Sequence, residues 1–162
     1  NALTTLLLAI ALASSGSAFA HGDSAYARKP EPVRKEQKDW GIAGEARAAR
    51  RSVVFTMSDT MRFTPDILHV KQGETIKIVV KNGGSMLHEF VLGTKKELEA
   101  HAALMVKFPN MEHDEPYMAH VPAGKTATII WTFNRAGEFD FACLIAGHYQ
   151  AGMVGKISVT AK

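Results

Sequence analysis

The amino-acid sequence predicts an all-β domain, an antiparallel sandwich or barrel that one short helix interrupts. Apolar and polar residues alternate in several short segments, which is the pattern of strands with one buried face. Turn-forming residues separate these segments, as in Gln72-Gly73 and Asn82-Gly83-Gly84. One stretch carries helix-capping residues instead. Short strands at this spacing are typical of antiparallel sandwiches and barrels.

The strand pattern recurs from residue 52 to the end of the chain. In TIKIVVK, residues 75–81, two isoleucines and a valine share one face, and two lysines lie on the other. In EFDFAC, residues 138–143, the alternation places Cys143 on the same face as two phenylalanines, so its thiol should point into the interior. The expected strands are 53–57, 67–70, 75–81, 89–92, 126–133, 138–143 and 156–160.

A single helix is expected between the strands at 89–92 and 126–133. Thr94-Lys95-Lys96-Glu97 has the form of a capping box, in which the threonine hydroxyl and the glutamate carboxylate satisfy amides of the first turn. The helix is predicted to run to about Met105. Residues 106–124 are then predicted to form a long loop before the next strand.

The first 20 residues have the features of a secretory signal peptide. Residues 1–20 carry no charge, contain an apolar run from Leu3 to Ala13, and end in Ala18-Phe19-Ala20, which fits a signal-peptidase site. A buried N-terminal helix is the alternative interpretation. The apolar run is shorter than the roughly 20 residues that a membrane span requires. We therefore expect export, with no membrane insertion after the signal is cleaved.

Composition divides the rest of the chain into a leader and a domain. Residues 21–51 are polar and lack sustained apolar periodicity, so they are predicted to form a flexible leader, with Trp40 and Ile42 as the residues that dock on the domain. Residues 52–162 are predicted to form the folded domain. The net charge of the chain is +3, and the leader carries all of this excess. Because the domain is neutral, we do not expect it to bind nucleic acid.

The only cysteine of the chain lies in CLIAGHYQAGM, directly after a predicted strand. A lone cysteine in an exported protein is a free thiol, half of an intermolecular disulfide or a metal ligand. His148 follows Cys143 by five positions, and Met153 follows His148 by five more. Thiolate, imidazole and thioether together suit copper, which favours two histidines, one cysteine and a distant axial methionine. His88 opens the strand at 89–92 after a glycine turn, so it is the candidate second histidine.

Other interpretations of this loop are weaker. Zinc prefers closed sets of cysteine, histidine and carboxylate, and it gains little from the thioether of Met153. Cysteine catalysis is disfavoured because His148 lies on the same loop and the strand register buries Cys143. A buried cysteine, a core methionine and a surface histidine are also ordinary structural residues. Those structural uses would leave an unpaired thiol in an exported protein.

At these residues the sequence resembles the cupredoxins, the small blue-copper proteins. The matching stretches are FTPDILHVKQGETIKIVVKN at 63–82, His88, and CLIAGHYQAGMVGKISV at 143–159, within residues 53–162. The resemblance implies a Greek-key β-sandwich with one inserted short helix. It also implies one type 1 copper ion, with His88, Cys143 and His148 as equatorial ligands and Met153 as the axial ligand.

The loop spacing is more similar to azurins, auracyanins and rusticyanins than to plastocyanins. The signal peptide, the leader and MLHEFVLG are similar to the periplasmic copper-tolerance cupredoxins of bacteria. Glu89 is a departure, because many cupredoxins have asparagine or serine after the first histidine, where a side-chain hydrogen bond joins the two ligand loops. Groups around the ligands tune a metal centre, so neither the redox potential nor the colour follows from the resemblance.

The resemblance implies a periplasmic one-electron carrier linked to copper tolerance. Copper sequestration or Cu(I) handling, without a dedicated electron-transfer partner, is the alternative. An enzyme is not expected, because the chain lacks the His-x-His pairs of multicopper oxidases. The protein is expected to be a monomer that binds a redox partner transiently, through an apolar surface around His148.

Further histidines and methionines raise the possibility of a weaker second copper site. The candidates in the long loop are Met111, His113, Met118 and His120, with His101 and Met105 paired on the predicted helix. His21 becomes a candidate if cleavage after Ala20 frees its amine. The alternative is that Met105 and Met118 pack under the loop while His101 and His113 are solvated. His69 is expected to point to water from its strand.

Overall fold

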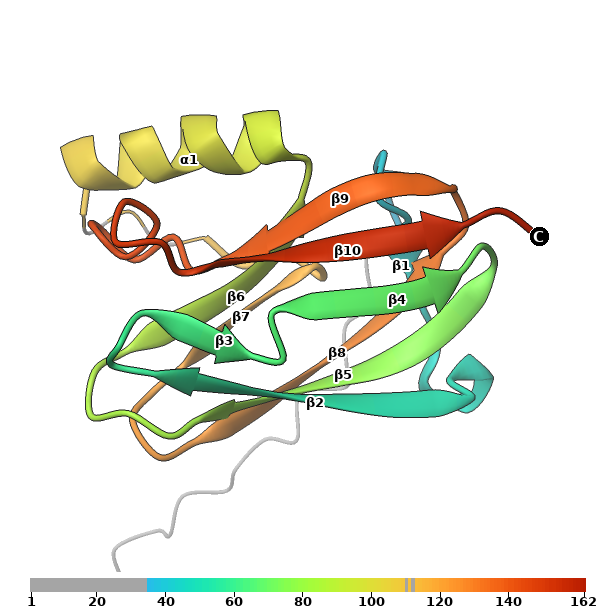
Figure 1. The fold of residues 1–162 in the computed structure, drawn as a ribbon, viewed down its shortest axis with the longest axis horizontal. Helices are drawn as coiled ribbons and strands as arrows, with labels where there is room; N and C mark the ends of the chain where they lie inside the picture. The colour runs from blue at the N-terminus through green and yellow to red at the C-terminus, as the bar shows by residue number, and fades with distance from the viewer. Residues whose placement is uncertain (1–34, 110, 112) are drawn as a thin grey trace, which may run out of the picture. The chain divides into compact units, whose positions relative to one another are not determined.

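The computed structural model describes residues 35–162 except 110 and 112. The predicted signal peptide, His21 and residues 22–34 of the predicted leader lie outside the described residues. The described residues form two five-stranded sheets and one α-helix (Figure 1). This confirms the prediction of an all-β sandwich with one inserted helix, and it excludes the alternative of a barrel.

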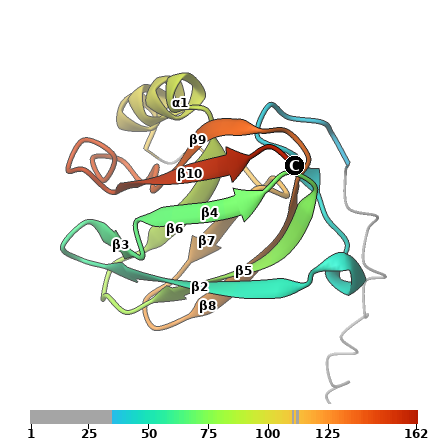
Figure 2. The ribbon, with the colours of Figure 1, turned by 45° about the vertical axis from the view of Figure 1, so that its right-hand side comes forward.

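Each sheet brings together strands that are distant in the chain. The first has the order β1-β8-β5-β2-β3 and the second has the order β4-β10-β9-β6-β7 (Figure 2). The strands of the first sheet are β1 (Ile42–Ala43), β2 (Arg51–Ser58), β3 (Arg62–Thr64), β5 (Glu74–Asn82) and β8 (Thr126–Phe133). Those of the second are β4 (Ile67–Lys71), β6 (His88–Gly93), β7 (Met118–Val121), β9 (Gly137–Ala142) and β10 (Val154–Thr160).

The prediction of an antiparallel sandwich was wrong in one respect, because each sheet contains a parallel pair. β2 pairs with β5 in parallel, and β4 pairs with β10 in parallel. The chain crosses from the first sheet to the second between β3 and β4, and it returns at β5. Because the chain passes through the other sheet between β2 and β5, these two strands can run in the same direction. Alternation of apolar residues carries no information on strand direction, so the sequence did not indicate this pairing.

A core of aromatic rings joins the two sheets. Phe55 of β2 packs against Phe90 of β6 and Phe141 of β9, with ring centroids 5.1 and 5.0 Å apart. All three side chains are fully buried. Burial of large apolar side chains is the dominant stabilising contribution in a domain of this size, so this contact fixes how the sheets face each other. It also fixes the positions of β6 and β9, from which the residues of the candidate site extend.

The helix covers the outer face of the second sheet. α1 (Lys95–Lys107) begins after Thr94, whose Oγ1 accepts a hydrogen bond from the Glu97 amide at 3.3 Å, so the predicted N-cap is confirmed. Leu98, Ala102 and Met105 form its buried face, which packs on a second apolar cluster. Since α1 covers one face of β6 and the aromatic core covers the other, all six residues of β6 are buried. This strand is therefore a rigid support for its first residue, His88.

The expected long loop at 106–124 was wrong in part, because β7 lies within it. Its four residues pair antiparallel with β6, with His88 opposite Val121 and Glu89 opposite His120. The segment was missed because it is short and because Met118 and Val121, its buried ends, do not alternate at period two. The three-residue strand β3 was also unexpected.

The described end of the predicted leader packs on the domain. Trp40 is buried, and the Trp131 indole nitrogen donates a hydrogen bond to the Trp40 carbonyl oxygen at 2.9 Å. β1 follows directly and pairs with β8, so it forms an edge of the first sheet. Docking through Trp40 and Ile42 is confirmed. His69 is exposed on β4, as the strand register indicates.

Candidate metal centre

Two adjacent strands bring the candidate site together at one end of the sandwich. β6 begins with His88, and β9 ends one residue before Cys143. Because β6 and β9 are antiparallel neighbours, the start of one lies beside the end of the other. The Glu89 amide donates a hydrogen bond to the Cys143 Sγ at 3.2 Å, which ties the two strand ends together.

The connection between β9 and β10 folds back so that His148 reaches the same point. The Met153 amide donates to the His148 carbonyl oxygen at 3.1 Å, and the Cys143 amide donates to the Met153 carbonyl oxygen at 3.0 Å. Gly147 has a φ of 88°, a conformation that suits glycine, directly before the histidine. Cys143, His148 and Met153 are therefore close in the sequence because all three lie on one tightly closed loop.

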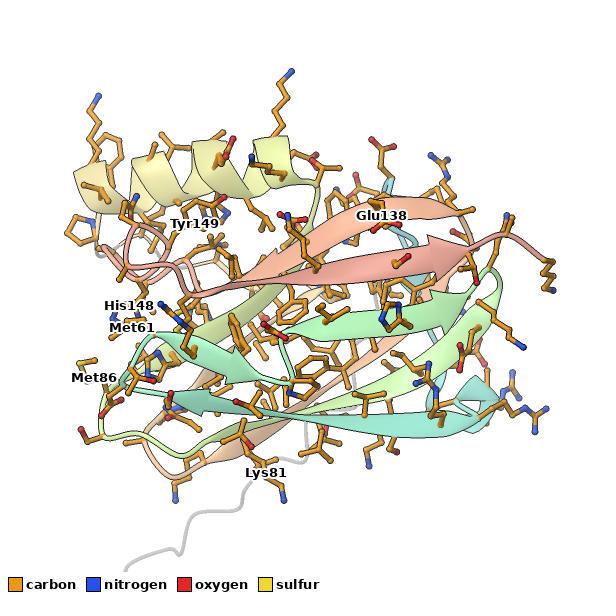
Figure 3. The ribbon with its side chains drawn as sticks, in the orientation of Figure 1. Met61, Lys81, Met86, Glu138, His148 and Tyr149 are labelled. Atoms are coloured by element: carbon orange, nitrogen blue, oxygen red, sulfur yellow. The ribbon has the colours of Figure 1, made fainter. Side chains whose placement is uncertain are left out.

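Three potential ligand atoms converge at this point. One atom from each of His88, Cys143 and His148 lies within 4.8 Å of the other two. The Cys143 Sγ lies 3.3 Å from the His148 Nδ1 and 3.9 Å from the His88 Nδ1. His88 and Cys143 are fully buried, whereas His148 is half-buried. Figure 3 shows His148 at the same end of the molecule as Met61 and Met86.

Burial controls the protonation of Cys143 and His148, the two donors that lie on the same loop. Burial raises the pKa of the Cys143 thiol to about 12, so the thiol keeps its proton at neutral pH. Burial also lowers the pKa of His148, and the neighbouring His88 lowers it further, so a neutral imidazole is favoured. A cation that replaces the thiol proton would therefore be attracted by a thiolate, with the imidazoles of His88 and His148 beside it. One soft sulfur and two imidazoles are a donor set that fits copper.

The fourth predicted ligand, Met153, is fully buried beside this cluster. Its backbone bonds to both Cys143 and His148, and its side chain packs in the same core as Cys143. The structure thus brings together the donor atoms of three of the four predicted site residues and places Met153 next to them. The assignment of all four as metal ligands remains a prediction.

Asp59 is a site residue that the sequence did not indicate. It lies in the turn between β2 and β3, and its Oδ1 is 3.1 Å from the His88 Nε2. Hydrogen bonds from the side chain and amide of Ser85 hold the pKa of Asp59 well below its ordinary value. Asp59 and His88 are 29 positions apart, one in a turn and the other at the start of β6, so no spacing rule links them.

Glu89 stands where the sequence analysis noted a difference from the asparagine or serine of many cupredoxins, and it makes two distinct contacts. Its amide bonds to the Cys143 sulfur, as described above, while its carboxylate contacts the His120 Nε2 on β7. The carboxylate is fully buried, and this burial raises the pKa of Glu89 to about 7. Glu89 therefore links the Cys143 loop to β7.

Three further histidines lie in a row that starts from His120. The His120 and His113 ring centroids are 6.0 Å apart, and those of His113 and His101 are 4.4 Å apart. Both ring nitrogens of His113 are buried without a hydrogen-bond partner among the described residues. The predicted packing of Met105 and Met118 under the loop is confirmed by their burial, whereas the solvation expected for the His113 nitrogens was wrong.

The fold and the three-donor cluster define a class of protein: a small β-sandwich with a metal centre at one end. A sequence model of the copper-binding proteins of the plastocyanin/azurin family matches residues 51–160. The chain belongs to this family of copper-binding proteins. Among the described residues, none of the helices is long and apolar enough to span a membrane.

Relatives of this chain share a name that refers to copper resistance. The chain is 44% identical over 154 residues to the copper-resistant cuproprotein CopI of Rubrivivax gelatinosus, and the alignment covers 95% of this chain and 93% of the relative. It is 35% identical over 149 residues to the CopI of Pseudomonas aeruginosa, with coverage of 74% and 82% respectively.

Solved structures of auracyanins share the fold. Auracyanin B superposes with a TM-score of 0.61 at 19% identity, covering 74% of this chain and 94% of that protein. Auracyanin from Roseiflexus castenholzii superposes with a TM-score of 0.58 at 20% identity, covering 69% and 98%. The cupredoxin fold that the sequence resemblance implied is therefore confirmed.

The burial of Cys143 predicts an unreactive thiol in the metal-free protein. A shift of the pKa from 9.0 to about 12 reduces the thiolate fraction at pH 8 by a factor of about 1000, and the thiolate is the reactive form. We expect labelling by a thiol-specific disulfide reagent to be at least about 100-fold slower in folded protein than in denaturant. Labelling of the folded chain within tenfold of the unfolded rate would show that the thiol is accessible and ionised.

Proposed function

We propose that this chain is an exported type 1 copper protein that carries one electron at a time in bacterial copper resistance. His88, Cys143 and His148 would hold one copper ion, with Met153 as a fourth ligand. The observation that carries this proposal is the convergence of one sulfur and one nitrogen from each of two imidazoles within 4.8 Å. Copper supplies a one-electron change between Cu(II) and Cu(I) at such a donor set.

The framework around the site supports electron transfer because it keeps the donors in one arrangement. His88 begins a strand that is buried on both faces, and Cys143 is tied to Glu89 and Met153 through backbone hydrogen bonds. Donors that move little between the two oxidation states keep the reorganisation energy of electron transfer small. Burial of Cys143 and His88 also excludes water from the metal.

His148 offers the route by which an electron would leave the site. It is half-buried, whereas His88 and Cys143 are fully buried, so it is the cluster member nearest to solvent. Met86 and Leu87 are 39% and 44% exposed directly before His88 and give this end an apolar surface. A transient redox partner would contact that surface through a small interface. In this proposal the protein is a monomer when the redox partner binds.

Copper resistance and a periplasmic location rest on different observations. The relatives from Rubrivivax gelatinosus and Pseudomonas aeruginosa are named copper-resistant cuproproteins, which supports the link to resistance. The apolar run and Ala18-Phe19-Ala20 support export. A carrier of this kind has no substrate to transform, so we propose a redox and binding role rather than an enzyme.

Copper handling at a second site is the alternative function, and one observation favours it. His101, His113 and His120 form a row that ends at Glu89, and within it the two nitrogens of His113 have no hydrogen-bond partner in the described part of the chain. Buried polar atoms are nearly always satisfied, so an unpartnered imidazole here favours a bound cation. Met111, which is 38% exposed, and the buried Met118 add thioethers on either side of His113 in the chain. Such a set would take Cu(I) and sequester it.

Replacing the cysteine tests the proposed centre directly. In Cys143→Ser, the hydroxyl is too weakly acidic to supply an anionic ligand, so the intense visible charge-transfer band of the Cu(II) protein should disappear. The narrow copper hyperfine splitting in the electron paramagnetic resonance spectrum should widen as well. His69→Ala is the matched control, because His69 is an exposed histidine on β4, and it should keep both signals. Retention of the band in Cys143→Ser would remove Cys143 from the ligand set.

Titration with Cu(I) under anaerobic conditions separates the two functions. If the histidine row binds copper, the metal-free protein should take up two equivalents, and His113→Ala should reduce this to about one. His69→Ala is again the control and should leave the stoichiometry unchanged. Saturation of the unmodified chain at one equivalent would contradict the second site and leave the electron carrier as the function.

A further inference from the structure

Asp59 makes four contacts with the segment that leads into β6. Its carboxylate accepts hydrogen bonds from the Ser85 amide at 2.8 Å, the Ser85 hydroxyl at 2.6 Å and the Met86 amide at 3.3 Å. Its Oδ1 also lies 3.1 Å from the His88 Nε2. A turn on the first sheet is thereby attached to the segment that ends in a candidate ligand of the second sheet.

We propose that Asp59 is a positioning residue for the metal centre, which fixes the tautomer and ring orientation of His88 and favours Cu(II) over Cu(I) through its charge. The inference rests on the proposed function in one respect, because it takes His88 to be a copper ligand. It deepens that function by assigning a role to a residue that does not itself touch the metal.

The tautomer follows from the hydrogen-bonding chemistry of the pair. An ionised carboxylate can only accept, so the Nε2 of His88 carries the proton that it donates to Asp59. The Nδ1 is then left with a lone pair, and Nδ1 is the atom that lies 3.9 Å from the Cys143 sulfur. A ligating imidazole is commonly held in this way, with its second nitrogen bonded to a carboxylate.

The ring orientation follows from how firmly Asp59 itself is held. Three donors from Ser85 and Met86 occupy its oxygens, so the carboxylate cannot rotate away without breaking them. Gly84 permits the close approach, since a Cβ at this position would lie only 1.9 Å from the Asp59 Oδ1. Asn82 secures the same segment from its other side, through Nδ2 bonds to the Met86 and Val121 carbonyl oxygens at 2.7 and 2.8 Å.

The effect on copper follows from charge. Asp59 places a negative charge on the far side of the His88 ring, where it attracts the more highly charged oxidation state. Asp59→Asn keeps the size of the side chain but removes this charge. The new amide can also donate to Nε2, which would allow the proton to move to Nδ1 and would block that nitrogen as a ligand.

Nuclear magnetic resonance of the metal-free protein, with ¹⁵N-labelled histidine, tests the tautomer without any copper. In the unmodified chain we expect His88 to carry its proton on Nε2 alone. In Asp59→Asn we expect a mixture of tautomers or the Nδ1 form. Protonation of His88 on Nδ1 in the unmodified chain would overturn the proposal, whether or not Asp59→Asn folds.

Copper binding supplies the second readout. We expect Asp59→Asn to lose about 10- to 100-fold in Cu(II) affinity, with a smaller loss for Cu(I), and therefore to have a higher reduction potential. Glu138→Gln is the matched control for charge, because Glu138 is exposed near the start of β9, away from the candidate centre (Figure 3). Ser85→Ala is the control for loop packing, because it removes one hydrogen bond to Asp59 and leaves the imidazole contact in place.

Two outcomes would overturn the role of Asp59. These are an unchanged tautomer together with unchanged affinities in Asp59→Asn, and an equal change in Glu138→Gln. Failure of the proposed function looks different, because the unmodified chain would then bind no copper at His88 while the metal-free tautomer still reported on the Asp59 contact. A change confined to Asp59→Asn supports the inference.

Discussion

The fully buried thiol of Cys143 is the constraint on which the rest of the structure depends. Burial makes the thiolate costly unless a cation lies beside it, and the side chains that contact the sulfur are the imidazoles of His88 and His148. The folded chain therefore places an electron-rich donor set in a dry position. A soft cation bound beside the sulfur would offset that cost as it displaces the thiol proton.

The β-sandwich supplies the rigidity that this arrangement requires. β6 and β9 are held between the aromatic core and α1, so the ends of these two strands have fixed positions. The candidate donors extend from those ends, while the loop of Cys143, His148 and Met153 closes through its own backbone hydrogen bonds. The exposed Met86 and Leu87 lie at the surface, where a partner would approach in the proposed role. Rigidly held donors inside the protein and an exposed apolar surface beside them suit the proposed electron carrier.

Local patterns in the sequence were sufficient for much of the fold and for the core of the candidate site. Alternation located most strands, the capping box located α1, and the spacing of Cys143, His148 and Met153 indicated a single loop. Contacts between segments that are distant in the sequence could not be predicted from these local patterns. The parallel pairing of β2 with β5 and the contact between Asp59 and His88 depend on how the sheets cross and pack, which neither alternation nor spacing records. The strand β7 was too short for its period to show.

X-ray absorption at the copper edge of the reconstituted protein tests the central claim most directly, because it reports the atoms bound to the metal. The account predicts one short copper–sulfur distance and two imidazole nitrogens at Cu(II), with nearly the same distances after reduction to Cu(I). A spectrum with only nitrogen and oxygen neighbours, or with a ligand set that changes on reduction, would contradict it.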